Sequence, residues 1–175
     1  RAGIEPSKGF WGRLSRHFLD CQNDDGGWGY TTGGSSPNMV TAGLASLYLV
    51  FDNHYTREPF RRDVPRRFTE GKAGEVLKAL ARGQEWLAKK RQLWGDGYYL
   101  YGIERCGVAS GEKILGGADW FARGAQTILR AQRPDGSIPI GAHGGGLVNT
   151  AFCTLFLLNG GAPLAFYKLD HREGH

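Results

Sequence analysis

The chain has 175 residues, of which 41% are hydrophobic and 22% are charged. These fractions are typical of a globular protein and exclude the disordered and fibrous classes. The net charge of +5 is too small to indicate a nucleic-acid partner. The longest mostly apolar runs, residues 42–51 and 151–158, are shorter than the roughly 20 residues that cross a bilayer. No transmembrane segment is therefore expected, and peripheral membrane contact stays compatible with the sequence.

The three cysteines further limit the kinds of site that the chain can contain. Cys21, Cys106 and Cys153 are odd in number and widely separated, and none belongs to a Cys-x-x-Cys pair. This pattern supports neither a disulfide framework nor a zinc site, and it slightly favours a reducing, cytoplasmic compartment. We expect no metal and no cofactor. The chain begins at Arg1 without a signal segment, which indicates a piece of a longer protein.

In chain order, the first predicted element is a pair of helices over about residues 10–53. Its first helix is one-sided, because Leu14, Phe18 and Leu19 recur at helical spacing. Its second helix is apolar nearly all round, which a helix tolerates when other helices surround it. A basic insertion follows at residues 54–72, where two prolines discourage helix. We interpret this insertion as a solvated loop, with anionic headgroups or diphosphates as the alternative partners.

The same plan recurs twice more. A second helix pair covers residues 73–109, with a reversal at residues 94–97, and a third covers residues 118–159. The tail, residues 160–175, is interpreted as an exit from the last pair. One-sided and all-round apolar helices pack well when the apolar ones form an inner barrel and the others sheath it. The sequence therefore predicts an all-α, single-domain α/α toroid, a partial or half barrel of three helical hairpin repeats. Strands are not expected, because period-two alternation is nearly absent.

A turn motif marks the repeat. The first pair carries Gln22, Asp25, Gly26 and Trp28, and the third carries Gln132, Asp135 and Gly136. A glutamine at the end of an outer helix can satisfy free backbone groups there, while the glycine permits the reversal and the tryptophan covers it. The aspartates are expected to cap the turns. We interpret the motif as a structural device that defines a fold rather than an active site.

These turns resemble the QW motif of squalene-hopene cyclases, oxidosqualene cyclases and related prenyltransferase-like repeats. The first copy reads Gln22-x-x-x-Gly26-x-Trp28, with Phe18 four residues before the glutamine. The third copy keeps Arg123-Gly124, Ile128, Gln132 and Gly136, with Ile138 in place of the tryptophan, and the middle copy keeps Arg82-Gly83 and Asp96-Gly97. The resemblance implies a complete toroid of six inner and six outer helices. This chain would then be about half of one, the carboxyl-terminal half, completed by the rest of the parent toroid or by a second chain.

The resemblance does not supply a catalytic residue. The cyclases of that family protonate a polyene with an Asp-x-Asp-Asp acid, which this chain lacks. The sister protein prenyltransferases hold zinc through an Asp-x-Cys pair and a histidine, and Cys106, Cys153 and His143 lack that pairing, so no metal site is predicted. Four residues at the start of the second inner helix are candidates for lining a central cavity, with structural packing as the alternative: Asp96, Tyr98, Tyr99 and Tyr101.

Two functions follow from these patterns. The first is a terpene-cyclase-like or prenyltransferase-like toroid segment that holds an apolar isoprenoid ligand in its inner cavity, with catalysis left open. The second is a non-catalytic toroid module that binds a protein or a glycan, and the missing acid motif is the evidence for it.

Overall fold

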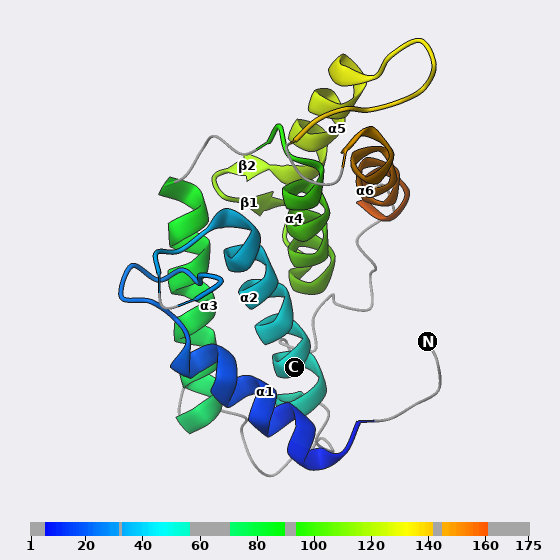
Figure 1. Ribbon diagram of the computed structural model, residues 1–175. Coiled ribbons are helices and arrows are strands. Elements are labelled where there is room, and N and C mark those ends of the chain that lie inside the picture. Colours follow the sequence, from blue (N-terminus) through cyan, green and yellow to red (C-terminus); the bar gives the residue numbers. More distant parts are fainter. Residues whose placement is uncertain (1–5, 32, 57–70, 90–93, 142–144, 161–175) are drawn as a thin grey trace, which may run out of the picture. The chain divides into compact units, whose positions relative to one another are not determined.

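A computed structural model describes residues 6–31, 33–56, 71–89, 94–141 and 145–160. At residues 8, 159 and 160 it describes the backbone alone. These residues are mostly helical (Figure 1), as the sequence predicts for the all-α class. The helices are α1 (Lys8–Asp20), α2 (Pro37–Val50), the π-helical extension η1 (Phe51–Tyr55), α3 (Gly71–Lys89), α4 (Gly97–Ser110), α5 (Trp120–Ala131) and α6 (Gly145–Gly160). Most of the predicted basic insertion, the predicted tail after Gly160, and His143 lie outside the described residues.

The structure adds a short β-hairpin that the sequence analysis did not expect. Strands β1 (Ile114–Leu115) and β2 (Ala118–Asp119) pair antiparallel, with Ile114 opposite Asp119. The two residues between them, Gly116 and Gly117, have φ angles of 59° and 74°, and a two-residue hairpin turn of type I′ requires positive φ at both positions. Strands of two residues are too short to produce a visible period-two alternation, which is why the expectation was wrong here.

The chain divides into two compact units, Arg1–Trp86 and Leu87–His175, and each is described by itself. The boundary falls near the end of α3. In the first unit α1 packs on α2, and in the second unit α4 and α5 both pack on α6. The first and third predicted pairs are therefore observed as packed helix pairs. The predicted middle pair, α3 and α4, spans the boundary between the units, so the toroid stays a prediction.

The core of the first unit forms around Trp28. This indole is almost fully buried, together with Val40, Leu44 and Leu47 of α2. Glycines make room for it, because a Cβ atom at Gly43 would lie 2.5 Å from the indole ring. Close packing of this kind leaves no space for a larger residue at the glycine.

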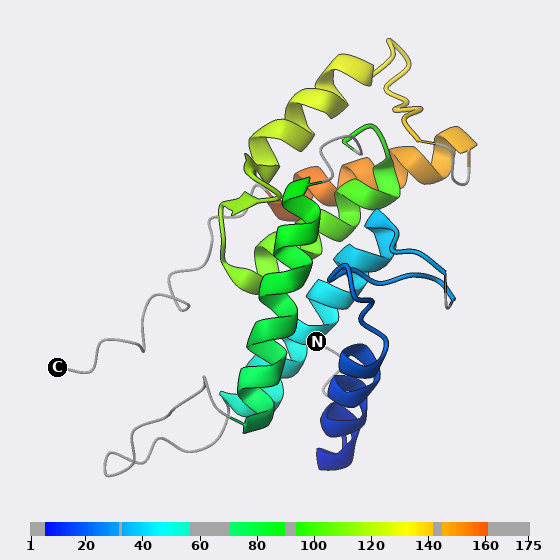
Figure 2. The ribbon, with the colours of Figure 1, turned by 90° about the vertical axis from the view of Figure 1, so that its left-hand side faces the viewer.

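The core of the second unit lies between α4, α5 and α6. Helices α4 and α6 run side by side (Figure 2). Trp120, at the start of α5, and Phe156 of α6 are buried and meet edge to face, with ring centroids 5.8 Å apart. Gly107 of α4 faces the Trp120 ring, and Gly124 of α5 faces Phe156. The small residues thus let large aromatic rings fill the space between the helices.

Side-chain caps fix where several helices begin. The Asp96 carboxylate accepts the Tyr99 N–H at 3.0 Å and starts α4, and the Asp119 carboxylate accepts the Ala122 N–H at 3.0 Å and starts α5. α4 ends at Gly111, which has a φ of 73°, the left-handed conformation that glycine adopts most easily. Within the described ranges, none of the helices has the length and apolar character needed to span a membrane.

Candidate functional site

The first turn, residues 22–28, is held by its own side chains. Gln22 Nε2 donates to the Gly26 carbonyl at 2.8 Å, and Asp25 Oδ1 accepts the Gly27 N–H at 2.9 Å. Gly26 has a φ of 88°, a backbone conformation that glycine adopts more easily than any other residue. The Trp28 indole N–H donates to the Phe18 carbonyl at 2.8 Å, which ties the turn back to the last turn of α1. Asp25 caps the turn as the sequence predicts, whereas Gln22 bonds to the Gly26 carbonyl of the turn rather than to a backbone group at the end of α1.

The same turn is also docked on α3, far along the sequence. Gln22 Nε2 makes a second bond, to the Ala79 carbonyl at 2.9 Å. The Arg82 guanidinium donates to the carbonyls of Asn23 at 2.8 Å and Asp24 at 3.1 Å. The Trp86 indole N–H donates to Asp25 Oδ2 at 2.8 Å. Gly26 therefore lies so close to α3 that a Cβ atom there would come within 2.8 Å of the Arg82 carbonyl oxygen.

The third-pair turn, residues 132–138, repeats the internal geometry. Asp135 Oδ1 accepts the Ser137 hydroxyl at 2.7 Å and its N–H at 2.9 Å, and these bonds hold the pKa of Asp135 below its usual range. Gln132 Nε2 lies 3.4 Å from the Gly136 carbonyl, and Gly136 has a φ of 83°. Ile138 is buried in the place where the first turn has its tryptophan. Residues 132–136 are exposed, whereas the first turn is partly buried against α3.

The four cavity candidates divide into two groups. Asp96 is the cap of α4, and Gly141 passes so near that a Cβ there would lie 3.1 Å from Asp96 atoms. Tyr99 is buried against Trp94, with ring centroids 5.9 Å apart, and burial raises the pKa of its hydroxyl. These two residues serve helix capping and the core.

Tyr98 and Tyr101 instead meet on one side of α4. Both are half-buried, and both contact Phe152 of α6, with ring centroids 5.3 Å and 5.4 Å from it. The Arg105 guanidinium lies 5.4 Å from the Tyr101 ring centroid, a cation–π distance. We call Tyr98, Tyr101 and Phe152 the aromatic trio.

An ion pair with a buried carboxylate, which the sequence analysis did not identify, adjoins this trio. Glu104 of α4 is fully buried and binds the neighbouring Arg105 through both carboxylate oxygens. These two bonds fix the Arg105 guanidinium beside the Tyr101 ring. An isolated Glu in an apolar helix was the only sequence signal for this ion pair.

Within the part of the second unit that the structure describes, the face of α6 beside the trio is exposed. Leu147 is 84% exposed and Leu158 is 70% exposed, and Val148 and Leu155 are also exposed. Leu147, Ala151 and Leu158 follow one another at helical spacing, so they lie on one face. The sequence indicates a helix surrounded by others, but the structure covers only the opposite face, through Cys153 and Phe156. Contiguous exposed apolar surface of this kind marks interaction sites more often than chance.

The three cysteines are free thiols in the structure. Cys106 and Cys153 are buried free thiols, and Cys21 is an exposed one. Burial, with a smaller effect of the Asp96 charge, raises the pKa of Cys153 to about 11, so this thiol is protonated at neutral pH. In the part of the chain that the structure describes, no three His, Cys, Asp or Glu side chains gather to hold a metal ion.

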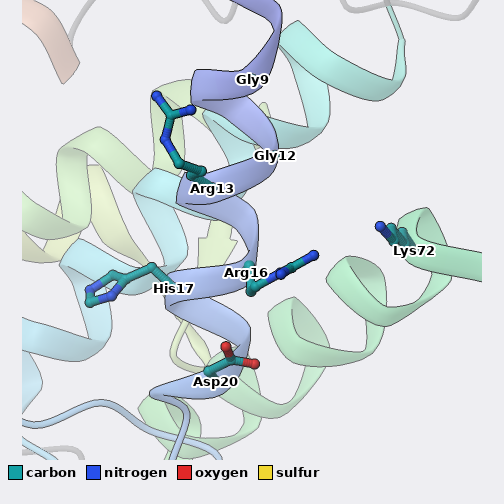
Figure 3. A pocket seen from close by; sticks show the side chains of 7 residues that line it. All are labelled: Gly9, Gly12, Arg13, Arg16, His17, Asp20 and Lys72. Carbon is teal, nitrogen blue, oxygen red and sulfur yellow. The ribbon is translucent and has the colours of Figure 1, made fainter.

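A shallow open depression of about 540 Å³ lies on α1 (Figure 3). It is lined by Gly9, Gly12, Arg13, Arg16, His17, Asp20 and, from α3, Lys72. Arg13 and His17 project from one side of α1, whereas Arg16 projects toward Lys72 (Figure 3). These side chains do not converge on a single point, so the depression is an exposed basic helix face rather than an enclosed site.

The fold and these features define a mostly helical protein with packed helix pairs and a repeated clamp-like turn. The chain matches no protein-family model, and it has no significant match among curated proteins or solved structures. The resemblance to QW-motif proteins depends on the motif residues alone, and no comparison tests it.

Proposed function

We propose that this protein is a segment of an α/α toroid of the squalene-cyclase and prenyltransferase-like kind, and that α4 and α6 bind an apolar, isoprenoid-class ligand. The observation that carries the proposal is the exposed apolar face of α6, next to the aromatic trio. Branched aliphatic side chains beside aromatic faces form a surface that suits a methyl-branched hydrocarbon chain. The QW-like turns support the toroid part of the proposal.

The proposed role is binding without acid catalysis by this chain. The sequence contains no Asp-x-Asp-Asp motif, and the buried carboxylate nearest the aromatic trio along α4, Glu104, is ion-paired with Arg105. A ring face next to a fixed guanidinium is already occupied by a cation, which reduces its use for a migrating carbocation. A ligand on this surface is therefore held by burial of apolar area.

The test is the affinity for farnesol, measured by isothermal titration calorimetry on the whole chain. Replacing both Leu147 and Leu158 with Glu places charges on the proposed surface, and both side chains are exposed enough for the fold to tolerate the change. We expect a loss in affinity of at least about tenfold, or about 1.4 kcal/mol. The matched control is Ile114→Glu, an exposed apolar residue on β1, which should leave affinity unchanged.

Two results would contradict the proposal. One is no heat of binding by the unaltered chain up to the solubility limit of farnesol. The other is an equal loss of affinity in the Ile114 control and in the α6 variant, since binding would then not depend on α6. Straight-chain dodecanol, measured beside farnesol, separates an isoprenoid preference from general apolar binding, and equal affinities would remove the isoprenoid class from the proposal.

A further inference from the structure

The two QW-like turns differ in what surrounds them. Both contain the same two backbone bonds, all 2.9 Å long. In the first turn the Gly26 N–H donates to the Asn23 carbonyl and the Asn23 N–H to the Gly27 carbonyl. In the third-pair turn the Gly136 N–H donates to the Arg133 carbonyl and the Arg133 N–H to the Ser137 carbonyl. A Cβ at Gly26 would collide with α3, whereas a Cβ at Gly136 would meet nothing within 4 Å. The third-pair turn therefore has the same backbone geometry as the first turn, but none of the described residues packs against it at Gly136.

The first turn shows what such a turn binds. Its partner helix α3 supplies three groups: the Ala79 carbonyl, the Arg82 guanidinium and the Trp86 indole N–H. They lie at positions i, i+3 and i+7, so all three are on one helix face. A helix that docks on the third-pair turn needs a guanidinium, an N–H donor four residues later, and an accessible carbonyl three residues earlier.

Helix α1 carries the same pattern on an exposed face. Arg13 precedes Gln22 by nine residues, just as Arg123 precedes Gln132, and Arg82-Gly83 matches Arg123-Gly124. Arg13 is thus the counterpart of Arg82. His17 follows Arg13 by four residues, as Trp86 follows Arg82, and both Arg13 and His17 are exposed on the same side of α1 (Figure 3).

We propose that the third-pair turn of one copy of this chain binds α1 of a second copy. The Arg13 guanidinium of the second copy then donates to the carbonyls of Arg133 and Pro134, which correspond to Asn23 and Asp24. Its His17 imidazole donates to the Asp135 carboxylate, and its Phe10 carbonyl accepts from Gln132 Nε2. The Arg13 guanidinium then meets carbonyl oxygens and lies near the Asp135 carboxylate, which are groups complementary to a cation. Next to Arg13, a Cβ atom at Gly12 would meet none of the described atoms within 4 Å, so a second copy can approach the backbone of α1 closely there.

This contact joins unlike surfaces, so it differs from a symmetric patch that binds itself. It does not depend on the ligand proposed above, because neither the turn nor α1 belongs to the α4–α6 surface.

The test begins with sedimentation velocity of the 175-residue chain over a micromolar concentration series. We expect self-association, and its loss in Arg13→Glu and in Gln132→Glu, since each places a carboxylate against carbonyl oxygens. The matched controls are Arg16→Glu on the other side of α1 and Gln126→Glu on the exposed part of α5, which should associate as the unaltered chain does. Circular dichroism checks that all four variants keep their helix content. A chain that stays monomeric throughout, or equal loss in variants and controls, would overturn the proposal.

A mixing experiment tests that the contact is head to tail. Arg13→Glu retains an intact third-pair turn, and Gln132→Glu retains an intact α1, so a mixture of the two can form one unaltered contact. We expect native mass spectrometry of the mixture, with one variant isotope-labelled, to show heterodimers where each variant alone is monomeric. Absence of heterodimers would exclude the head-to-tail contact, because two identical turns or two identical α1 faces meeting would not be rescued by mixing.

Discussion

Replacing Trp28 with alanine is expected to destabilise the first unit by about 3–5 kcal/mol. The indole is 1% exposed and packs closely against Gly43 and Gly83. Alanine would leave a cavity and would also remove the bond from the indole N–H to the Phe18 carbonyl. Since many domains are stable by only about 5–15 kcal/mol, this loss would approach unfolding of the unit.

The measurement is urea denaturation followed by circular dichroism, with hydrogen exchange of the α2 amides to assign the loss to the first unit. Tyr30→Ala is the matched control, because this aromatic residue lies two positions away in the sequence and is 66% exposed. It should change stability by no more than about 0.5 kcal/mol. Similar effects of the two substitutions would show that Trp28 does not organise the unit.

The second large effect is expected at Gly107, where alanine should destabilise the second unit by about 1–3 kcal/mol. A Cβ there would lie 2.2 Å from Cε2 of Trp120, closer than any packed carbon atoms allow. The indole cannot move away freely, because its N–H donates to the Glu112 carbonyl at 2.8 Å and its ring contacts Phe156. The α4–α5 packing must therefore open to admit the methyl group.

Gly146→Ala is the control for this prediction. Gly146 lies in α6 with nothing within 4 Å of an added Cβ, so alanine there is expected to stabilise by about 0.4–1 kcal/mol, through the lower entropy of the unfolded chain. Urea denaturation of both variants should thus give effects of opposite sign. A stabilising effect of Gly107→Ala would contradict the packing described for Trp120.

The helices were predictable because their signals are local. Apolar residues spaced three and four apart specify a helix without reference to the rest of the chain. Helix α5 lies within the predicted third pair, residues 118–159, and α6 ends one residue beyond it, at Gly160. The roles of Asp25 and Gly26 within their turn were predictable for the same reason, since an Asx cap and a positive φ concern neighbouring residues. The β-hairpin was missed because two residues per strand carry no pattern.

The rest depends on contacts between distant residues. Nothing in the sequence near Asp25 indicates that Trp86 donates to it across 61 positions. The pairing of Glu104 with the next residue, and its complete burial, likewise depend on how α4 packs. The apolar character of α6 was visible in the sequence, but residue types alone do not show which face of the helix is covered by its neighbours. Separating Tyr98 and Tyr101 from Tyr99 also required the positions of Phe152 and Trp94.

The central proposal is that an isoprenoid chain lies against α4 and α6, and the most direct test is photo-crosslinking with a diazirine-bearing farnesol. After irradiation, the labelled positions are identified by peptide mass spectrometry. We predict labels within Gly97–Ser110 and Gly145–Gly160, centred on Tyr101, Phe152 and Leu155, and suppressed by excess farnesol. Labels confined to α1, α3 and the loops, or labelling that excess farnesol does not suppress, would contradict it.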